Sequence, residues 1–241
     1  MARQRNEQAQ LLADVRLFEG LDANGLIGAT VPARRVQRER DSSFFRQGQE
    51  AKSFFVVIDG RVKVSQVTPE GHQIVVRYAG SGEMFGCVPL YGGKEYPATA
   101  TAVTRCEALA WDRPAVDRLM ERYPRIAINA LELLGEELTQ VRSRYQELAT
   151  ERVERRVARA LLRLVSQAGK KVKGGVLIEF PLSRQDLAEL TGTTLHTVSR
   201  ILSGWQQMGI IESGRRRIVI RKPHGLVSIA EDLDAGDSGT S

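Results

Sequence analysis

A segment near the C-terminal end of the chain, residues 195–203, carries the side chain types that read the edges of base pairs. Arg200 suits a bidentate contact with guanine, and Ser199 and His196 lie within one helical turn of it, where they reach adjacent bases. Leu195 and Thr197 each offer a methyl group to thymine. Simpler roles stay open for two of these residues, since Ser199 can face solvent alone and His196 can approach a phosphate.

Capping and stop signals predict two short helices that present this segment. Ser183, with an acidic residue three positions later, forms a variant of the capping box. Gly192 ends the first helix because glycine adopts a positive φ without steric cost. Thr193 or Thr194 caps a second helix over residues 195–208, and the next glycine ends it. Two short helices joined by such a turn form a helix-turn-helix, whose second helix enters the major groove of DNA by its N-terminus.

The residues that follow predict a wing, a β-hairpin beside the two helices. Ser213 and Gly214 form the expected turn, and Arg215, Arg216 and Arg217 cluster at its tip. Guanidinium groups grip phosphate bidentately, although three arginines can also serve only to keep a turn soluble. The expected phosphate contacts are Ser183, Arg184, Thr194, Ser203, Arg215, Arg216 and Arg217.

The distribution of charge agrees with a polyanionic partner for one part of the chain. Residues 151–222 contain fifteen Lys or Arg and six Asp or Glu, a net charge of +9, which leaves −3 of the total of +6 for the rest. The sequence contains no run of about 18 apolar residues, so no membrane span is expected, and the N-terminus has no apolar signal segment. We therefore expect a cytoplasmic protein without a membrane partner, in which the two cysteines are reduced.

The first half of the chain reads as short strands and turns. Residues 54–67 alternate apolar and polar positions around Asp59-Gly60, which predicts a β-hairpin. Glycines recur at residues 48, 60, 71, 80, 82 and 86. Many short strands with regular turns are typical of a β-sandwich or barrel. One or two short helices are expected over residues 11–29.

A long helix is predicted from Pro124 to about Ala149. Its apolar positions alternate between spacings of four and three residues, the heptad pattern of a coiled coil. A stripe this narrow favours pairing with a second chain over burial along the helix's own domain, which is the alternative. The expected homodimer contacts are Leu131, Leu134, Leu138, Val141, Tyr145 and Leu148.

Taken together, these motifs resemble the cyclic-AMP receptor/fumarate-nitrate regulator (CRP/FNR) family. Residues 44–74, the turn at residues 82–86 and, most specifically, residues 182–202 with the wing carry the resemblance. It implies an α+β chain with three parts: a β-roll sensor domain over residues 1–123, a dimerisation helix over 124–149 and a winged helix-turn-helix over 150–241. It also implies a transcription regulator, more often an activator, that contacts double-stranded DNA, a second copy of itself and RNA polymerase, the last through the loop at residues 166–175.

The family's effector site is the point where this sequence departs. Members that bind cyclic AMP carry a Gly-Glu pair and an Arg-Ser pair at the positions of Gly86-Cys87 and Tyr96-Pro97, so the counter-charges of cyclic AMP are missing and this ligand is not expected. The absence of cysteines before Cys87 excludes a four-cysteine iron–sulfur cluster. The expected effector pocket consists of Met84, Phe85, Gly86, Cys87, Tyr96 and Pro97.

Residues 95–103 resemble the anaerobic and nitrogen-oxide branch of the family, some of whose members sense nitric oxide through haem. His72 and Cys87 are the candidate haem ligands, with an exposed turn residue and a small buried side chain as the simpler interpretations. The sequence therefore leaves the cofactor unidentified, and a regulator without any effector is the other alternative.

Two other classes of protein fit the residues less well. A metal-dependent oxygenase on the β-roll requires two or three histidines and a carboxylate around one ion, whereas the chain has only three histidines, two of them in or beyond the DNA module. A module that binds protein in place of DNA would have little use for the arginine wing and the Ser199-Arg200 pair. No enzymatic activity and no metal site are therefore expected.

Overall fold

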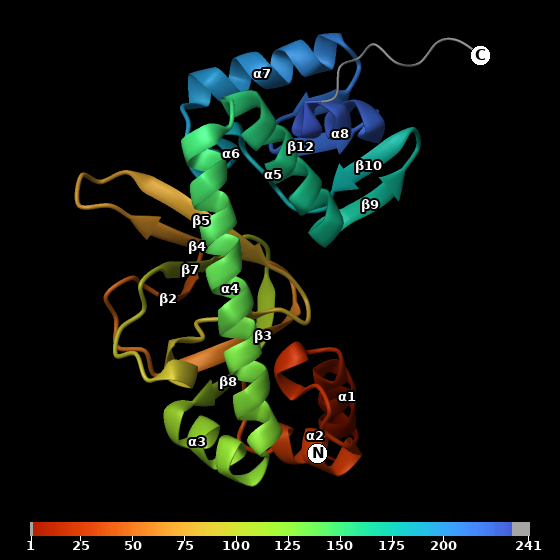
Figure 1. Cartoon of the computed structure of the whole chain (residues 1–241). Helices are drawn as coiled ribbons and strands as arrows, with labels where there is room; N and C mark the ends of the chain where they lie inside the picture. Colours follow the sequence, from red (N-terminus) through yellow and green to blue (C-terminus); the bar gives the residue numbers. More distant parts are fainter. Residues whose placement is uncertain (1, 233–241) are drawn as a thin grey trace. The chain divides into compact units, whose positions relative to one another are not determined.

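The computed structural model describes residues 2–232, with side chains for residues 7–232. Two compact units divide within the long helix α4 (Pro124–Thr150), between Arg142 and Ser143, and residues 73–75 also group with the second unit (Figure 1). The division at the two ends of this helix stays a prediction from the sequence. Among residues 2–232, no helix combines the length and apolar character that crossing a membrane requires.

The first unit contains two antiparallel four-stranded sheets, as the β-sandwich pattern predicts. One sheet has the order β1 (Arg34–Arg38), β8 (Cys106–Asp112), β3 (Ser53–Asp59) and β6 (Met84–Phe85). The other has the order β2 (Ser43–Phe45), β7 (Thr99–Ala102), β4 (Val62–Val67) and β5 (Gln73–Ala79). Apolar residues of both sheets share one buried cluster, so the sheets pack face to face.

The predicted hairpin around Asp59-Gly60 is wrong in one respect. The turn exists, and Gly60 has a φ of +86°, but β3 pairs with β8 and β6 whereas β4 pairs with β7. The chain therefore crosses here from one sheet to the other. A Cβ on Gly60 would lie 2.4 Å from the carbonyl oxygen of Arg105, so the close approach of this crossing requires glycine. Alternation along a strand does not reveal which sheet the strand joins.

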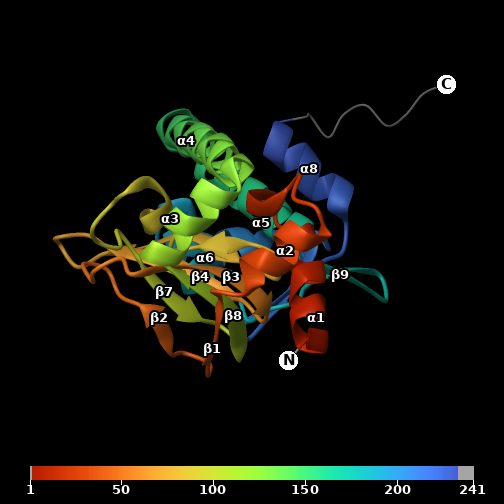
Figure 2. The same cartoon turned by 90° about the horizontal axis from the view of Figure 1, so that it is seen from below.

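Helices close one face of the first sheet. They are α1 (Ala2–Ala13), the 3₁₀ turn η1 (Arg16–Phe18), α2 (Ala23–Thr30) and α3 (Arg113–Arg122), with a second 3₁₀ turn, η2 (Val88–Tyr91), after β6. Asp22 caps α2 by accepting a hydrogen bond from the backbone N–H of Gly25 at 2.7 Å, and Asp112 caps α3 in the same way. Figure 2 shows α1 and α2 beside the strands that they cover. The helical segment at the N-terminus is longer than residues 11–29, which the sequence predicts.

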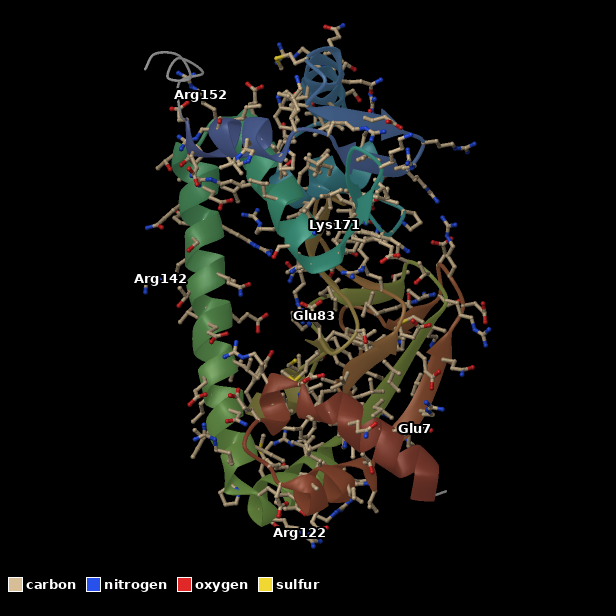
Figure 3. The ribbon with its side chains drawn as sticks, turned by 90° about the vertical axis from the view of Figure 1, so that its right-hand side faces the viewer. Glu7, Glu83, Arg122, Arg142, Arg152 and Lys171 are labelled. Atoms are coloured by element: carbon tan, nitrogen blue, oxygen red, sulfur yellow. The ribbon has the colours of Figure 1, made fainter. Side chains whose placement is uncertain are left out.

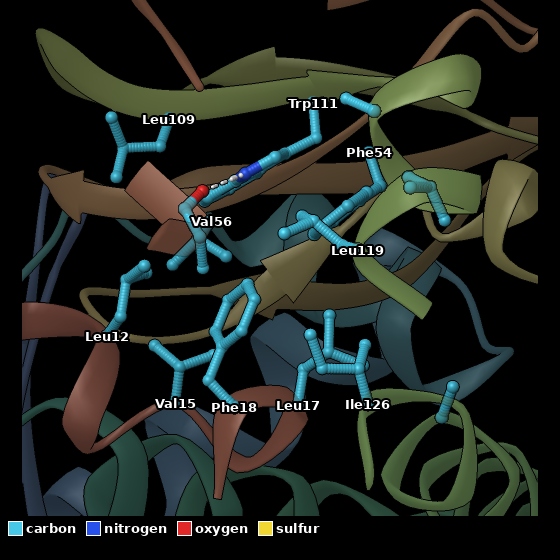
Figure 4. Packing of buried hydrophobic residues seen from close by; sticks show 14 residues of the cluster. Leu12, Val15, Leu17, Phe18, Phe54, Val56, Leu109, Trp111, Leu119 and Ile126 are labelled. Atoms are coloured by element: carbon cyan, nitrogen blue, oxygen red, sulfur yellow. Dashed lines mark hydrogen bonds between the residues drawn. The ribbon is translucent and has the colours of Figure 1, made fainter. Parts of the chain in front are cut away.

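Trp111 lies at the centre of the core between this sheet and the helices (Figure 4). Its ring stacks on Phe54 at a centroid distance of 4.9 Å and contacts Phe18 at 5.6 Å. Its indole N–H donates to the carbonyl oxygen of Ala29 at 2.8 Å, so the polar atom of this buried ring is satisfied. The contact joins α2 to β8.

Helix α4 begins on this core with one face and exposes another. Ile126 and Ala130 are buried, and the amide of buried Asn129 donates to the carbonyl oxygens of Leu17 and Glu19 at 3.0 and 2.9 Å. The heptad stripe lies elsewhere on the helix and is exposed at Leu131, Leu138, Val141, Tyr145 and Leu148, with Leu134 half-buried. Charged side chains such as Arg142 also project from α4 (Figure 3).

The second unit contains four further helices and a four-stranded sheet. The helices are α5 (Val153–Ala168), α6 (Arg184–Thr191), α7 (Leu195–Gln207) and α8 (Pro223–Glu231). The sheet has the order β11 (Ile211–Gly214), β12 (Arg217–Ile220), β10 (Gly175–Ile178) and β9 (Gly169–Val172). Residues 170–175, which the sequence predicts as a loop, instead form most of the β9–β10 hairpin, with Gly174 at a φ of +74° in its turn.

Candidate nucleic-acid interface

The first helix of the predicted pair is held by the capping box that the sequence indicates. The Ser183 hydroxyl accepts from the backbone N–H of Asp186 at 3.0 Å, and the Asp186 carboxylate accepts from the backbone N–H of Ser183 at 3.1 Å. At the other end of α6, Gly192 has a φ of +61° and forms the C-cap in the left-handed conformation. Both ends of the first helix thus agree with the prediction, and the Ser183 hydroxyl is already engaged within the cap.

Thr194, one of two residues the sequence offers, caps the second helix. Its hydroxyl oxygen accepts from the backbone N–H of Thr197 at 3.2 Å and lies 2.9 Å from the Thr197 hydroxyl. The cap orients the first turn of α7 and leaves its terminal N–H groups directed outward, where they favour an anion. Thr197 is therefore tied to the cap, whereas Thr194 keeps an exposed position at the helix start.

Helix α7 separates its two faces sharply. Val198, Leu202 and Trp205 are completely buried. On the opposite side His196, Arg200 and Ser203 are exposed and Ser199 is half-buried, and none of these four side chains has a hydrogen bond or ion pair within residues 2–232. Leu195 is 46% exposed in the first turn. Of the side chains expected to read bases, all but Thr197 therefore lie near the helix N-terminus without a hydrogen bond or ion pair among the described residues.

The wing is a tight hairpin whose turn differs from the predicted one. Ser213 and Gly214 belong to β11, and the turn consists of Arg215 and Arg216, because Gly214 pairs with Arg217 across the hairpin. Arg216 has a φ of +56°, an uncommon conformation for a residue with a side chain. All three arginines are exposed, so the tip presents guanidinium groups as expected.

Not all of the wing arginines are equally free. Arg217 donates to the Glu212 carboxylate at 2.9 Å, and Arg221 also binds this carboxylate. The hydrogen bonds from Arg221 and then Arg217 lower the pKa of Glu212, which keeps it ionised. Arg215 and Arg216 have no such partner among the described residues. The electrostatic strength of the wing therefore rests on these two residues more than on Arg217.

Two further arginines organise the module, one at a predicted contact position and one that sequence reasoning missed. Arg184, at the start of α6, donates to the Ser213 hydroxyl at 3.1 Å and links the helix to the wing. Arg156, on α5, donates to the carbonyl oxygens of Thr191 at 3.1 Å, Gly192 at 3.4 Å and Glu151 at 3.0 Å. It therefore joins the end of α4 to the turn between α6 and α7. In the sequence it is one of several arginines on an amphipathic helix, and no local signal distinguishes it.

Three residues of the predicted effector pocket lie among buried aromatic rings. Phe85 is 0% exposed and stacks on Phe55 at 4.9 Å, while Tyr96 is 4% exposed and stacks on Phe45 at 3.7 Å. A Cβ on Gly86 would lie 2.7 Å from the ring of Phe45. Aromatic rings therefore pack closely around Phe85, Gly86 and Tyr96.

Two other residues of this set point away from that aromatic core. Met84 packs against the separate cluster around Trp111, because neighbouring residues of a strand face opposite sides of the sheet. Pro97 is exposed.

The candidate haem ligands His72 and Cys87 differ in their surroundings. His72 is exposed in the β4–β5 turn, and residues 2–232 contain no group of three or more His, Cys, Asp or Glu that could hold a metal ion. Burial raises the pKa of the Cys87 thiol from 9.0 to about 11, so the free thiolate is disfavoured at neutral pH. Cys106 is buried, and its pKa is raised to about 12 for the same reason.

Comparison with known proteins identifies both units. Residues 35–123 match the cyclic nucleotide-binding domain, and residues 155–229 match the Crp-like helix-turn-helix domain. The cyclic AMP receptor protein of Thermus thermophilus is 30% identical over 217 residues, which cover 90% of this chain and 97% of the relative. The CRP-like cAMP-activated global transcriptional regulator of Mycobacterium tuberculosis is 24% identical over 211 residues, which cover 88% and 94%.

Solved structures show the same fold. FixK2 from Bradyrhizobium japonicum has a TM-score of 0.72 and 25% identity, and the match covers 86% of this chain and 99% of that one. The c-di-GMP responsive global regulator CLP from Xanthomonas campestris has a TM-score of 0.71 at 24% identity and covers 83% and 99%. Sheets, long helix and helix-turn-helix thus occur in the same order in these proteins.

Proposed function

Because the chain belongs to the CRP/FNR family of transcription regulators, we propose that it binds a palindromic DNA operator as a homodimer. The observation that carries the proposal is the unengaged polar face of α7, which leaves Arg200, Ser199 and His196 available for base edges. A two-fold dimer places two such helices in major grooves about one helical turn apart, so the operator has two inverted half-sites.

The dimer contact is assigned to the stripe on α4. Leu131 is 70%, Leu138 62% and Tyr145 73% exposed, and they follow a heptad spacing along one side of the helix. A continuous row of large apolar side chains in water is costly, and packing against the same row of a second copy removes it from solvent. Leu134, Val141 and Leu148 complete the proposed contact.

Arg200 is assigned to guanine, with Ser199, His196, Leu195 and Thr197 at neighbouring bases. The family commonly has Glu at the position of His196, followed by Ser and Arg as here, so we expect a related half-site with one altered base preference. The proposed phosphate contacts remain Ser183, Arg184, Thr194, Ser203 and the wing arginines.

Neither cyclic AMP nor haem is part of the proposal. The positions that would hold the charged groups of cyclic AMP are Cys87 and Tyr96, so the charged side chains that members binding this ligand carry there are absent. We therefore propose that operator binding needs neither ligand. Transcription activation through RNA polymerase, with the β9–β10 hairpin as the contact, is the proposed outcome of binding.

Binding-site selection with purified protein, followed by fluorescence anisotropy on the selected duplex, tests the proposal. We expect an inverted repeat bound without added cyclic AMP or haem, with an affinity that falls steeply with salt. An operator without two-fold symmetry, or binding that appears only with cyclic AMP, would contradict it. In vitro transcription from a promoter carrying the selected site tests activation.

Sedimentation of a stripe variant tests the dimer. Leu131→Glu combined with Leu138→Glu places charges on the stripe, and we expect monomers that bind the operator weakly. Gln140→Glu is the control, because it adds a negative charge at an exposed position on the opposite side of α4. If the double variant sediments as the wild type does, the assignment of the dimer contact to α4 is contradicted.

A further inference from the structure

A cavity of about 650 Å³ opens at one edge of the two packed sheets of the first unit. This volume is sufficient for a small organic molecule. It lies where β1 and β2, the edge strands of the two sheets, leave the interior uncovered. Of the six residues predicted as an effector pocket, only Tyr96 lines it. The cavity is therefore a different place in the fold.

The floor of the cavity is aromatic and rigid. Tyr96 stacks on Phe45 at 3.7 Å, and Phe44 packs edge-on against Phe55 at 5.6 Å. The backbone N–H of Ser53 donates to the Tyr96 hydroxyl at 3.0 Å, and that hydroxyl donates to the Ser53 carbonyl oxygen, which fixes the ring. Phe44 is half-buried and gives this floor an accessible ring, whereas Phe45 and Tyr96 line the cavity as buried rings.

The rim of the cavity is strongly basic. Arg34, Arg35, Arg38 and Lys52 line it, with Glu50 as the one acidic residue. Lys52 pairs with Glu50 at 3.1 Å, and Arg35 pairs with Glu107 at 2.7 Å, so these two cations are compensated. The two remaining arginines give the rim an excess of positive charge.

Arg34 and Arg38 share one face of β1 with Val36, because side chains alternate along a strand. Val36 packs against the aromatic cluster, so this face borders the interior, with Arg34 exposed and Arg38 half-buried at the rim. The Arg38 guanidinium lies over the Phe44 ring at 5.6 Å and donates to the Ser43 carbonyl oxygen at 3.0 Å, which holds it above the floor. The Arg34 side chain has no hydrogen bond or ion pair within the described part of the chain.

We propose that this cavity binds a small organic anion with a flat apolar body. The body lies on the rings of Phe44, Phe45 and Tyr96, and the anionic group is held by Arg34 with Arg38. A charged group on an edge strand can also serve only to prevent pairing with another chain, and in that case no ligand recognises it. The inference does not depend on DNA binding or on the dimer.

Fluorescence titration with two dyes on the full chain distinguishes these roles. The probe is 8-anilinonaphthalene-1-sulfonate, a flat aromatic anion, and its neutral counterpart is N-phenyl-1-naphthylamine, which lacks the sulfonate. We expect saturable binding of the sulfonate dye, weakened about tenfold by Arg34→Ala because a charge-assisted hydrogen bond is lost. Binding of the neutral dye stays unchanged, and since Arg34 holds no other side chain, the fold remains intact.

Arg105→Ala is the matched control, because it removes an exposed arginine of the same unit outside the cavity. It leaves both dyes unaffected if the proposal holds. The proposal is overturned by the absence of saturable binding of the sulfonate dye, by equal affinity in wild type and Arg34→Ala, or by equal weakening of both dyes. It is also overturned if Arg105→Ala weakens the sulfonate dye as much as Arg34→Ala does.

Discussion

The sequence predicts ligand contacts both in the helix-turn-helix module and in the interior of the β-roll, but the two sets of side chains differ in exposure. On α7, His196, Arg200 and Ser203 are exposed and have no hydrogen bond or ion pair within residues 2–232, whereas a row on the other face is completely buried. Between the sheets, Phe85 is completely buried and stacks with Phe45 and Phe55. Packing therefore leaves the polar face of α7 accessible to a ligand and removes the ring of Phe85 from solvent.

The largest effect is expected from Phe85→Ala. If Phe85 is a core residue, its removal leaves a cavity and lowers the free energy of unfolding by about 3–5 kcal/mol. Urea denaturation of this variant measures the loss, with His196→Ala as a surface control that should stay within about 0.5 kcal/mol of wild type. A near-normal stability for Phe85→Ala would show that the interior has room, and the contrast between the regions would fail.

Arg200→Ala should have the next largest effect, and on DNA affinity alone. Loss of a bidentate contact costs about 1–3 kcal/mol of binding and relaxes one guanine position of the half-site. Arg217→Ala is the comparison, and we expect a smaller loss because Glu212 already binds this guanidinium. Anisotropy titrations on the selected operator and on single-base variants measure both. Equal losses, or unchanged guanine preference, would contradict the assignment.

Ser183→Ala should cost about 1 kcal/mol of stability, because its hydroxyl caps α6. Ser203→Ala, which removes an exposed hydroxyl without a partner, should leave the unfolding free energy unchanged and reduce DNA affinity slightly. Thermal denaturation and anisotropy of the two variants together separate capping from contact. A destabilised Ser203→Ala would mean that this face of α7 is not free.

The smallest effect concerns the thiols and appears only at high pH. The folded chain holds the Cys87 proton up to a pKa of about 11, whereas the unfolded chain releases it near 9.0. This contribution to stability is complete below pH 9 and is lost as the pH rises toward 11. The difference in unfolding free energy between wild type and Cys87→Ala should therefore be constant from pH 6 to 8 and change above pH 9. A change near pH 7 would indicate a reactive thiolate and reopen a sensing role for Cys87.

Much of the DNA-binding module could be predicted from the sequence because its signals are local. The capping box at Ser183, the left-handed Gly192 and the heptad spacing on α4 each depend on residues within one or two helical turns. The family resemblance and the order of sheets, long helix and winged module are confirmed by the comparisons.

Only the tertiary structure decided which of these side chains are free. In the structure, β3 and β4 belong to different sheets, the wing turn consists of Arg215 and Arg216, and Arg217 donates a hydrogen bond to Glu212. It also brought Arg156 to the turn of the module, 35 residues away along the chain at Thr191. Strand pairing, ion pairs and core packing bring together residues that are distant in the sequence. The residue pattern of one segment therefore does not predict which other segment packs against it.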